Sequence, residues 1–260
     1  MLLAIDIGNT TIALGVFEGK TLAREWRARS EREKTADEYG ILLLDLLRLS
    51  GLEPSVVDGV VVSSVVPPLT PAFQELSQRL FGRKALVVGP GLRTGMPLLY
   101  DNPGEVGADR VVASIAAYEK YGGPCIVVDF GTATTFDAVT AKGEYLGGAI
   151  APGIGISAEA LYLRTAKLPR IEVVKPKRAI GKTTVASMQS GIYFGYVGLV
   201  NHLIEEISGE LGGQAAIVVT GGFGGALGPE IRGDHHFEPH LVLEGLRIIY
   251  DRNAGEKAGD

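Results

Sequence analysis

Two short segments of the chain combine a carboxylate, a glycine and small polar side chains in the same order. The first reads Asp6-Ile7-Gly8-Asn9-Thr10-Thr11 and the second reads Asp129-Phe130-Gly131-Thr132-Ala133-Thr134. Glycine lets a backbone approach a ligand closely, backbone N–H and Asn or Thr groups donate to phosphate oxygens, and a carboxylate can hold a cation or its water. One Asp-x-Gly turn also closes plain hairpins, so the case for a phosphate site depends on the repetition.

A different chemistry is available at Asp109-Arg110. A carboxylate next to an alcohol can accept its proton, and a planar guanidinium is suited to binding a carboxylate. The same pair could instead be a solvated pair in the first turn of a helix, where the helix dipole favours Asp. The two residues alone do not decide between these readings.

Strands must position both turns. Apolar runs predict strands at residues 2–7, 12–17 and 22–27, and the series restarts with strands at 126–129, up to 139, and at 145–150. The two turns stand 129 − 6 = 123 residues apart, close to half of the chain. We therefore expect two similar domains, residues 1–118 and 119–260, that face a common cleft, each with strands first and helices after.

Helix signals follow the first set of strands. Thr35 and Glu38 form a capping box before a periodic apolar run that Gly51 can end. A buried strand is expected from Val60 to Val66, and Thr70 with Pro71 predicts the start of another helix. Later in the chain, the apolar positions at 192, 193, 197, 199, 200 and 203 predict a long helix with a core or dimer face, and the polar tail 254–260 is expected to fray.

The composition excludes several classes of protein. The net charge is −5 without a basic run, which disfavours a nucleic-acid partner. The single cysteine, Cys125, excludes an intrachain disulfide and a four-cysteine zinc site, and its apolar surroundings predict a buried residue. No apolar run approaches the roughly 20 residues of a membrane helix, and the N-terminus lacks a signal-peptide pattern. A cytoplasmic protein is expected.

With these features in place, the chain resembles the type III pantothenate kinases of the acetate and sugar kinase, heat-shock ATPase and actin superfamily. The resemblance covers nearly the whole chain and rests on five motifs in order: Asp6-Ile7-Gly8-Asn9-Thr10, Gly107-Ala108-Asp109-Arg110, Asp129-Phe130-Gly131-Thr132-Ala133-Thr134-Thr135, Gly147-Gly148-Ala149-Ile150-Ala151-Pro152-Gly153 and Thr220-Gly221-Gly222. It implies an α/β protein with a duplicated ribonuclease-H-like, actin-like ATPase fold. The implied reaction is ATP-dependent phosphorylation of pantothenate to 4′-phosphopantothenate, the first step of coenzyme A synthesis.

The resemblance also implies roles for individual residues. ATP phosphates would be bound by Asp6, Ile7, Gly8, Asn9, Thr10, Thr11, Ile12, Ala13 and Thr132. Pantothenate would be bound by Tyr100, Gly107, Ala108, Asp109, Arg110 and Thr184, with Asp109 as the proton acceptor. Asp129 would hold a monovalent cation, potassium or ammonium, and magnesium would accompany ATP. The family further implies a homodimer.

Other readings remain open. The protein could be a kinase for another small hydroxyl acceptor, or a non-catalytic nucleotide-binding regulator. Gly181-Lys182-Thr183 resembles the end of a P-loop, but Pro176 stands where the first glycine should be. The run 153–158 fits a loose dinucleotide fingerprint outside the required strand–helix unit. His235, His236 and His240 lie close in sequence without a carboxylate or cysteine cluster, so a metal site there is disfavoured.

Overall fold

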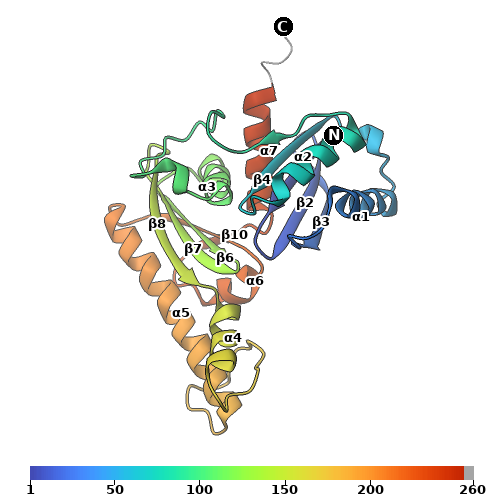
Figure 1. The fold of residues 1–260 in the computed structure, drawn as a ribbon. Helices are drawn as coiled ribbons and strands as arrows, with labels where there is room; N and C mark the ends of the chain where they lie inside the picture. Colours follow the sequence, from blue (N-terminus) through green and yellow to red (C-terminus); the bar gives the residue numbers. More distant parts are fainter. Residues whose placement is uncertain (255–260) are drawn as a thin grey trace. The chain divides into compact units, whose positions relative to one another are not determined.

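The computed structural model describes residues 1–254, which form two compact units (Figure 1). The first unit contains Met1–Pro97, Asp101–Ala116 and the chain from His240 onward. The second contains Leu98–Tyr100 and Ala117–Pro239. Residues 255–260, most of the tail expected to fray, lie outside the described part. Each unit is built around its own five-stranded sheet.

The sheet of the first unit has the strand order β3-β2-β1-β4-β5. Its strands are β1 (Leu2–Ile7), β2 (Thr11–Glu18), β3 (Thr21–Arg29), β4 (Gly59–Ser64) and β5 (Leu86–Val87). The first three form an antiparallel meander, whereas β4 pairs in parallel with β1 and with β5. The three expected N-terminal strands are thus confirmed: β1 has the predicted bounds, and β2 and β3 are slightly longer than predicted.

Helices cover both faces of this sheet. Helices α1 (Ala36–Leu49) and α2 (Leu69–Phe81) pack with Leu3, Ile5 and Ile7 of β1 in one hydrophobic core. Helix α7 (Leu241–Ala254) contacts β1, β2 and β4, and its Leu243 lies against Gly15 on the other face. Because residues of a strand alternate between faces, β1 is buried on both sides.

The local signals around these helices are partly confirmed. Thr35 and Glu38 form the predicted capping box at the start of α1. Thr70 was expected to open the second helix, and this is wrong: α2 already begins at Leu69, with Pro68 at the cap and the Leu69 amide bonded to the Val66 carbonyl. The strand expected to reach Val66 ends at Ser64, because the Ser64 hydroxyl accepts from the Val66 amide and turns the chain.

The second unit repeats the arrangement with the strand order β10-β9-β6-β7-β8. Its strands are β6 (Cys125–Phe130), β7 (Ala133–Val139), β8 (Tyr145–Pro152), β9 (Ala216–Thr220) and β10 (His235–Phe237). Again the first three strands, β6, β7 and β8, form an antiparallel meander. Strand β9 pairs in parallel with β6, and β10 pairs in parallel with β9. The predicted duplication is therefore present in strand order and in strand direction.

The remaining helices are α3 (Ala108–Tyr121), α4 (Ile154–Arg164), α5 (Thr184–Glu210) and the short α6 (Gly224–Leu227), with 3-10 turns η1 (Pro54–Val56), η2 (Pro103–Glu105) and η3 (Gly228–Glu230). The chain passes from the first unit to the second within α3. The division at residue 118 stays a prediction about the two sequence halves, because the compact units follow packing and assign α7 to the first unit. No helix among residues 1–254 is long and apolar enough to cross a membrane.

Helix α5 packs on the sheet of the second unit and supplies its core. Tyr193 and Val200 are buried there, and the other predicted apolar positions of the helix are partly buried against them, namely Ile192, Val197, Leu199 and Leu203. Cys125 is also buried as predicted, and burial raises the pKa of its thiol to about 12. This thiol is therefore protonated and packs as an apolar group.

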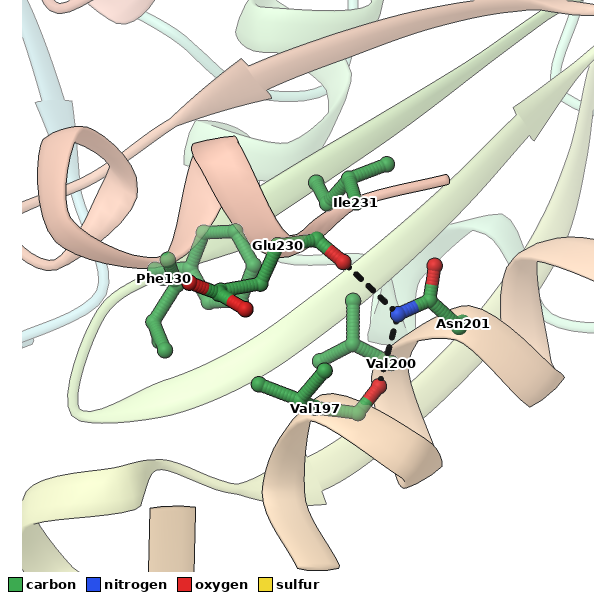
Figure 2. Close-up of a pocket in the computed structure, with 7 residues that line it drawn as sticks. Phe130, Val197, Val200, Asn201, Glu230 and Ile231 are labelled. Carbon is green, nitrogen blue, oxygen red and sulfur yellow. Dashed lines mark hydrogen bonds between the residues drawn. The ribbon is translucent and has the colours of Figure 1, made fainter. Parts of the chain in front are cut away.

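Asn201 fixes the segment after α6 to α5 (Figure 2). Its amide nitrogen donates to the carbonyl oxygens of Val197 and Glu230, at 2.9 and 3.0 Å, and its amide oxygen accepts from the Arg232 amide at 2.8 Å. The surrounding niche, which Phe130 and Val200 help to line, has no room for a water molecule. In the intact protein these three backbone groups are therefore satisfied by the Asn201 side chain and not by water in this niche.

We predict that Asn201→Ala lowers the free energy of unfolding by about 1–3 kcal/mol, because buried backbone groups lose their partners. Urea unfolding followed by circular dichroism measures the change. His202→Ala is the matched control, since the neighbouring side chain is 68% exposed. Equal stability of the Asn201→Ala variant and the wild type would contradict a stabilising role for the Asn201 hydrogen bonds.

Candidate active site

The turn between β1 and β2 is closed by its glycine. The Gly8 amide donates to the Thr11 carbonyl at 3.0 Å, and a Cβ at Gly8 would lie only 3.0 Å from that same oxygen. The side chains of Asn9, Thr10 and Thr11 are exposed, and that of Asp6 is half-buried. The turn therefore presents hydroxyl and amide groups to solvent, in the form that phosphate recognition needs.

Not every residue of the predicted ATP segment offers its side chain to a ligand. Ile7 and Ile12 pair across β1 and β2 and are fully buried in the core that α1 and α2 cover. They can contribute only backbone groups at this turn. Ala13 pairs with Asp6 and is half-buried on the opposite face.

Asp109 is the second residue of α3. The contacts of Gly107, which directly precedes the helix, show where the start of α3 lies in the first unit. A Cβ at Gly107 would lie 3.7 Å from Val65, and the Val65 amide donates to the Ile7 carbonyl at 3.0 Å. Ile7 directly precedes Gly8. The start of α3 and the polar turn therefore meet at one edge of the first unit's sheet, where the parallel strands β1 and β4 end.

Gly107 also has to be a glycine for Asp109 to keep its position. A Cβ there would lie 2.6 Å from Oδ1 of Asp109, too close for any other residue without movement. The same oxygen accepts a hydrogen bond from the Arg110 amide at 2.8 Å. The carboxylate is thus held by the backbone at the first turn of the helix.

The environment of Asp109 makes it more basic than a surface carboxylate. Burial raises its pKa above the ordinary value, and the Arg110 amide and guanidinium oppose that rise only in part. A general base works best when its pKa approaches the pH at which it operates. The shift therefore favours proton acceptance by this side chain.

In the second unit, glycines hold the Asp129 turn. Gly221 has a φ of +89°, and a Cβ there would lie 2.3 Å from Oδ1 of Asp129. Gly153 donates its amide to the Thr132 carbonyl at 3.1 Å and leaves no room for a Cβ beside it. The end of β6, the turn after β9 and the start of α4 therefore converge, with the Thr132 side chain exposed.

Tyr100 and Thr184 lie on two further elements of the second unit. The Leu99 amide donates to the Tyr145 carbonyl at 2.8 Å, and the Tyr100 ring lies against Gly147 of β8. Thr184 is the exposed first residue of α5, after the capping Thr183. It lines an open hollow with Leu168, Gly181, Lys182, Thr183, Ser187 and Met188.

Some features of the site were not assigned from the sequence. Gly153 and Gly221 belong to recognised motifs, but only their contacts reveal that they support the Asp129 turn. Arg32 was not considered, and its guanidinium lies 3.5 Å from the Asn9 amide oxygen. No local signal identifies such a contact, because the two residues come from different loops.

The three C-terminal histidines have separate environments. His236 stacks on Tyr121, with ring centres 4.0 Å apart, whereas Nδ1 of His240 lies 2.5 Å from a carboxylate oxygen of Glu25. His235 contacts the Gly233 carbonyl. Within residues 1–254 no group of three or more His, Cys, Asp or Glu side chains is placed to hold a metal ion.

Comparison with known proteins decides the family. The type III pantothenate kinase family model matches residues 2–206. The chain belongs to the type III pantothenate kinase family. It is 56% identical to the type III pantothenate kinase of Moorella thermoacetica, over 97% of this chain and all of the relative. The corresponding protein of Geobacter sulfurreducens is 53% identical, over 97% of this chain and 99% of the relative.

Solved structures support the fold of this family member. A putative Baf family transcriptional activator from Campylobacter jejuni superposes with a TM-score of 0.61 at 18% identity, covering 97% of this chain and 99% of that one. The ethanolamine utilization protein EutJ from Carboxydothermus hydrogenoformans gives 0.57 at 14% identity, covering 95% and 89%. At these identities the likeness concerns the fold alone. The predicted fold class, a duplicated ribonuclease-H-like, actin-like α/β protein, is confirmed.

The raised pKa of Asp109 has a consequence for stability. Because the folded carboxyl binds its proton more tightly than the unfolded one, its contribution to stability is full below the ordinary pKa of 3.8 and is lost as pH rises through the folded pKa. We predict that wild type loses stability relative to Asp109→Asn over this range. Urea unfolding of both proteins from about pH 3 to about pH 8 tests this, and parallel stability profiles would contradict it.

Proposed function

We propose that this chain catalyses the ATP-dependent phosphorylation of pantothenate to 4′-phosphopantothenate, the first step of coenzyme A synthesis. The observation that carries the proposal is the position of Asp109 in the first unit. A half-buried carboxylate with a raised pKa stands at the same sheet edge as a glycine-closed turn of exposed hydroxyl and amide groups. Membership of the family supports pantothenate as the acceptor.

The reaction needs little covalent chemistry from the protein. The hydroxyl oxygen of pantothenate attacks the γ-phosphorus of ATP, the bond between that phosphorus and the bridging oxygen of ADP breaks, and the hydroxyl proton passes to the Asp109 carboxylate. Such a transfer depends mainly on in-line positioning and charge neutralisation. Gly8, Asn9, Thr10 and Thr11 hold phosphate oxygens in this proposal, with Thr132 as a further donor.

Two cations belong to the proposal, one for each of the two turns. Magnesium enters with ATP, and the half-buried Asp6 carboxylate at the end of β1 is suited to its water shell. Asp129 is proposed to hold potassium or ammonium. Its carboxylate, against which the Gly221 backbone packs, offers the oxygen ligands that such a cation takes.

The remaining roles concern the acceptor and the assembly. Tyr100, Gly107, Ala108, Arg110 and Thr184 are proposed to contact pantothenate, with the Arg110 guanidinium suited to its carboxylate. We also propose a cytoplasmic homodimer. Apolar side chains exposed on the second unit support a partner surface there, among them Leu146, Ile150 and Phe194.

ADP release by the purified chain with MgATP, with and without pantothenate, tests the function. We predict that release requires pantothenate and that Asp109→Asn lowers turnover by roughly 10²–10⁴-fold while ATP binding persists, because the proton acceptor is lost. Asp45→Asn removes an exposed carboxylate of α1 and serves as the control. Release that is indifferent to pantothenate would exclude this acceptor and favour another substrate or a regulator.

The cation role predicts a separate result. Asp129→Ala is expected to abolish the difference between ADP release in potassium and in sodium buffer, since the proposed ligand of the monovalent cation is gone. Rates in the two buffers over a range of salt concentration give the measurement. A variant that potassium still activates like the wild type would refute the assignment.

A further inference from the structure

The strand β3 carries two arginines on the same sheet face as Asp6. Asp6 of β1 pairs with Ala13 of β2, and Ala13 pairs with Arg27 of β3. Two residues nearer the turn, Thr11 of β2 pairs with Arg29 of β3. Directly paired residues point to the same side of a sheet, so both guanidinium side chains share the face of the Asp6 carboxylate and the Thr11 hydroxyl.

Burial confirms which face this is. Trp26 and Ala28, which alternate with the two arginines, pack against the core under α1 and α2. The opposite face is covered by α7 near Gly15, where Leu243 makes contact. Toward the turn that cover ends, because Thr11, Arg27 and Arg29 are exposed.

The two guanidinium groups have no carboxylate partner in the described part of the chain. The carboxylates of the neighbouring acidic residues contact other groups: Glu25 lies 2.5 Å from Nδ1 of His240, and Glu31 forms an ion pair with Lys34 at 2.8 Å. Arg32, three residues beyond Arg29, reaches the Asn9 amide oxygen at 3.5 Å. Arg29 and Arg32 therefore bring positive charge next to the turn, and neither forms an ion pair in the described part of the chain.

The turn itself needs such charge if it binds a nucleotide. Residues 6–13 contain no lysine or arginine, so their groups offer a polyphosphate only neutral donors. Adjacent strands lie about 4.8 Å apart, which puts the Arg27 backbone about 10 Å from that of Asp6 and within reach of a long side chain. Arginine binds phosphate with paired, charge-assisted hydrogen bonds.

We propose that Arg27 and Arg29 bind the phosphate groups of the nucleotide held at the β1–β2 turn, supplying the cationic charge that the turn lacks. The proposal rests on the nucleotide-binding function given above and adds two phosphate-binding residues from an edge strand to it. The competing explanation is that the arginines are only solvated charges that keep an edge strand from pairing with other chains.

Binding of MgATP to the full chain separates the two explanations. Isothermal titration of wild type, Arg27→Gln, Arg29→Gln and the double variant gives the affinities, and competition by inorganic tripolyphosphate isolates the phosphate contribution. We expect each single variant to bind MgATP roughly 10-fold more weakly and the double variant up to about 100-fold more weakly, with a parallel loss for tripolyphosphate. The Arg27→Lys and Arg29→Lys double variant should recover much of the affinity, because charge is restored.

Arg24→Gln is the matched control. Arg24 is exposed on the same strand, but it alternates with Arg27 onto the other face and donates to the Ala23 carbonyl. Unchanged MgATP affinity in the double glutamine variant, or an equal loss in Arg24→Gln, would overturn the proposal. A wild-type chain that binds MgATP but releases no ADP with pantothenate would refute only the proposed reaction, and the arginine variants would still be tested by titration.

Discussion

The parallel pairing of β1 with β4 is the constraint on which the first unit's site depends. Ile7 and Ser64 are register partners at the ends of these strands, and the Val65 amide closes the ladder on the Ile7 carbonyl. Beyond this point both segments leave the sheet: Gly8 turns the chain toward β2, and the Val65 side chain packs beside Gly107. A polar turn and a helix start meet there because parallel strands end at a common edge.

Glycines permit the close approaches around both turns. Gly8 and Gly107 act in the first unit, where a side chain would strike a carbonyl oxygen or the Asp109 carboxylate. Gly153 and Gly221 have the same role in the second unit, where a Cβ would lie even closer to its neighbouring atoms. Each carboxylate is therefore held by backbone packed against it, and such packing leaves the position of the carboxylate little freedom to change.

Asp109 shows the cost of this arrangement. Burial that raises the pKa of its carboxyl makes the side chain a better proton acceptor, and the same burial makes the ionised form unfavourable in the folded protein. In the role proposed for Asp109, stability and proton acceptance therefore place opposite demands on this residue. The charges of β3 are different, because Arg27 and Arg29 are exposed and form no ion pair in the described part of the chain.

The sequence by itself determined the local elements and the duplication. Apolar runs, the capping box at Thr35 and the repeated Asp-x-Gly turn depend on neighbours in the chain, so they could be read without a structure. What only the tertiary structure decided are the contacts between distant segments: Gly107 beside Val65, Gly221 against Asp129, and α7 on the first unit's sheet. The alignment of Asp6, Ala13 and Arg27 on one sheet face was also decided by the tertiary structure, because it follows from strand register. Register and helix placement are fixed by packing across the whole unit, and no local pattern of residues encodes them.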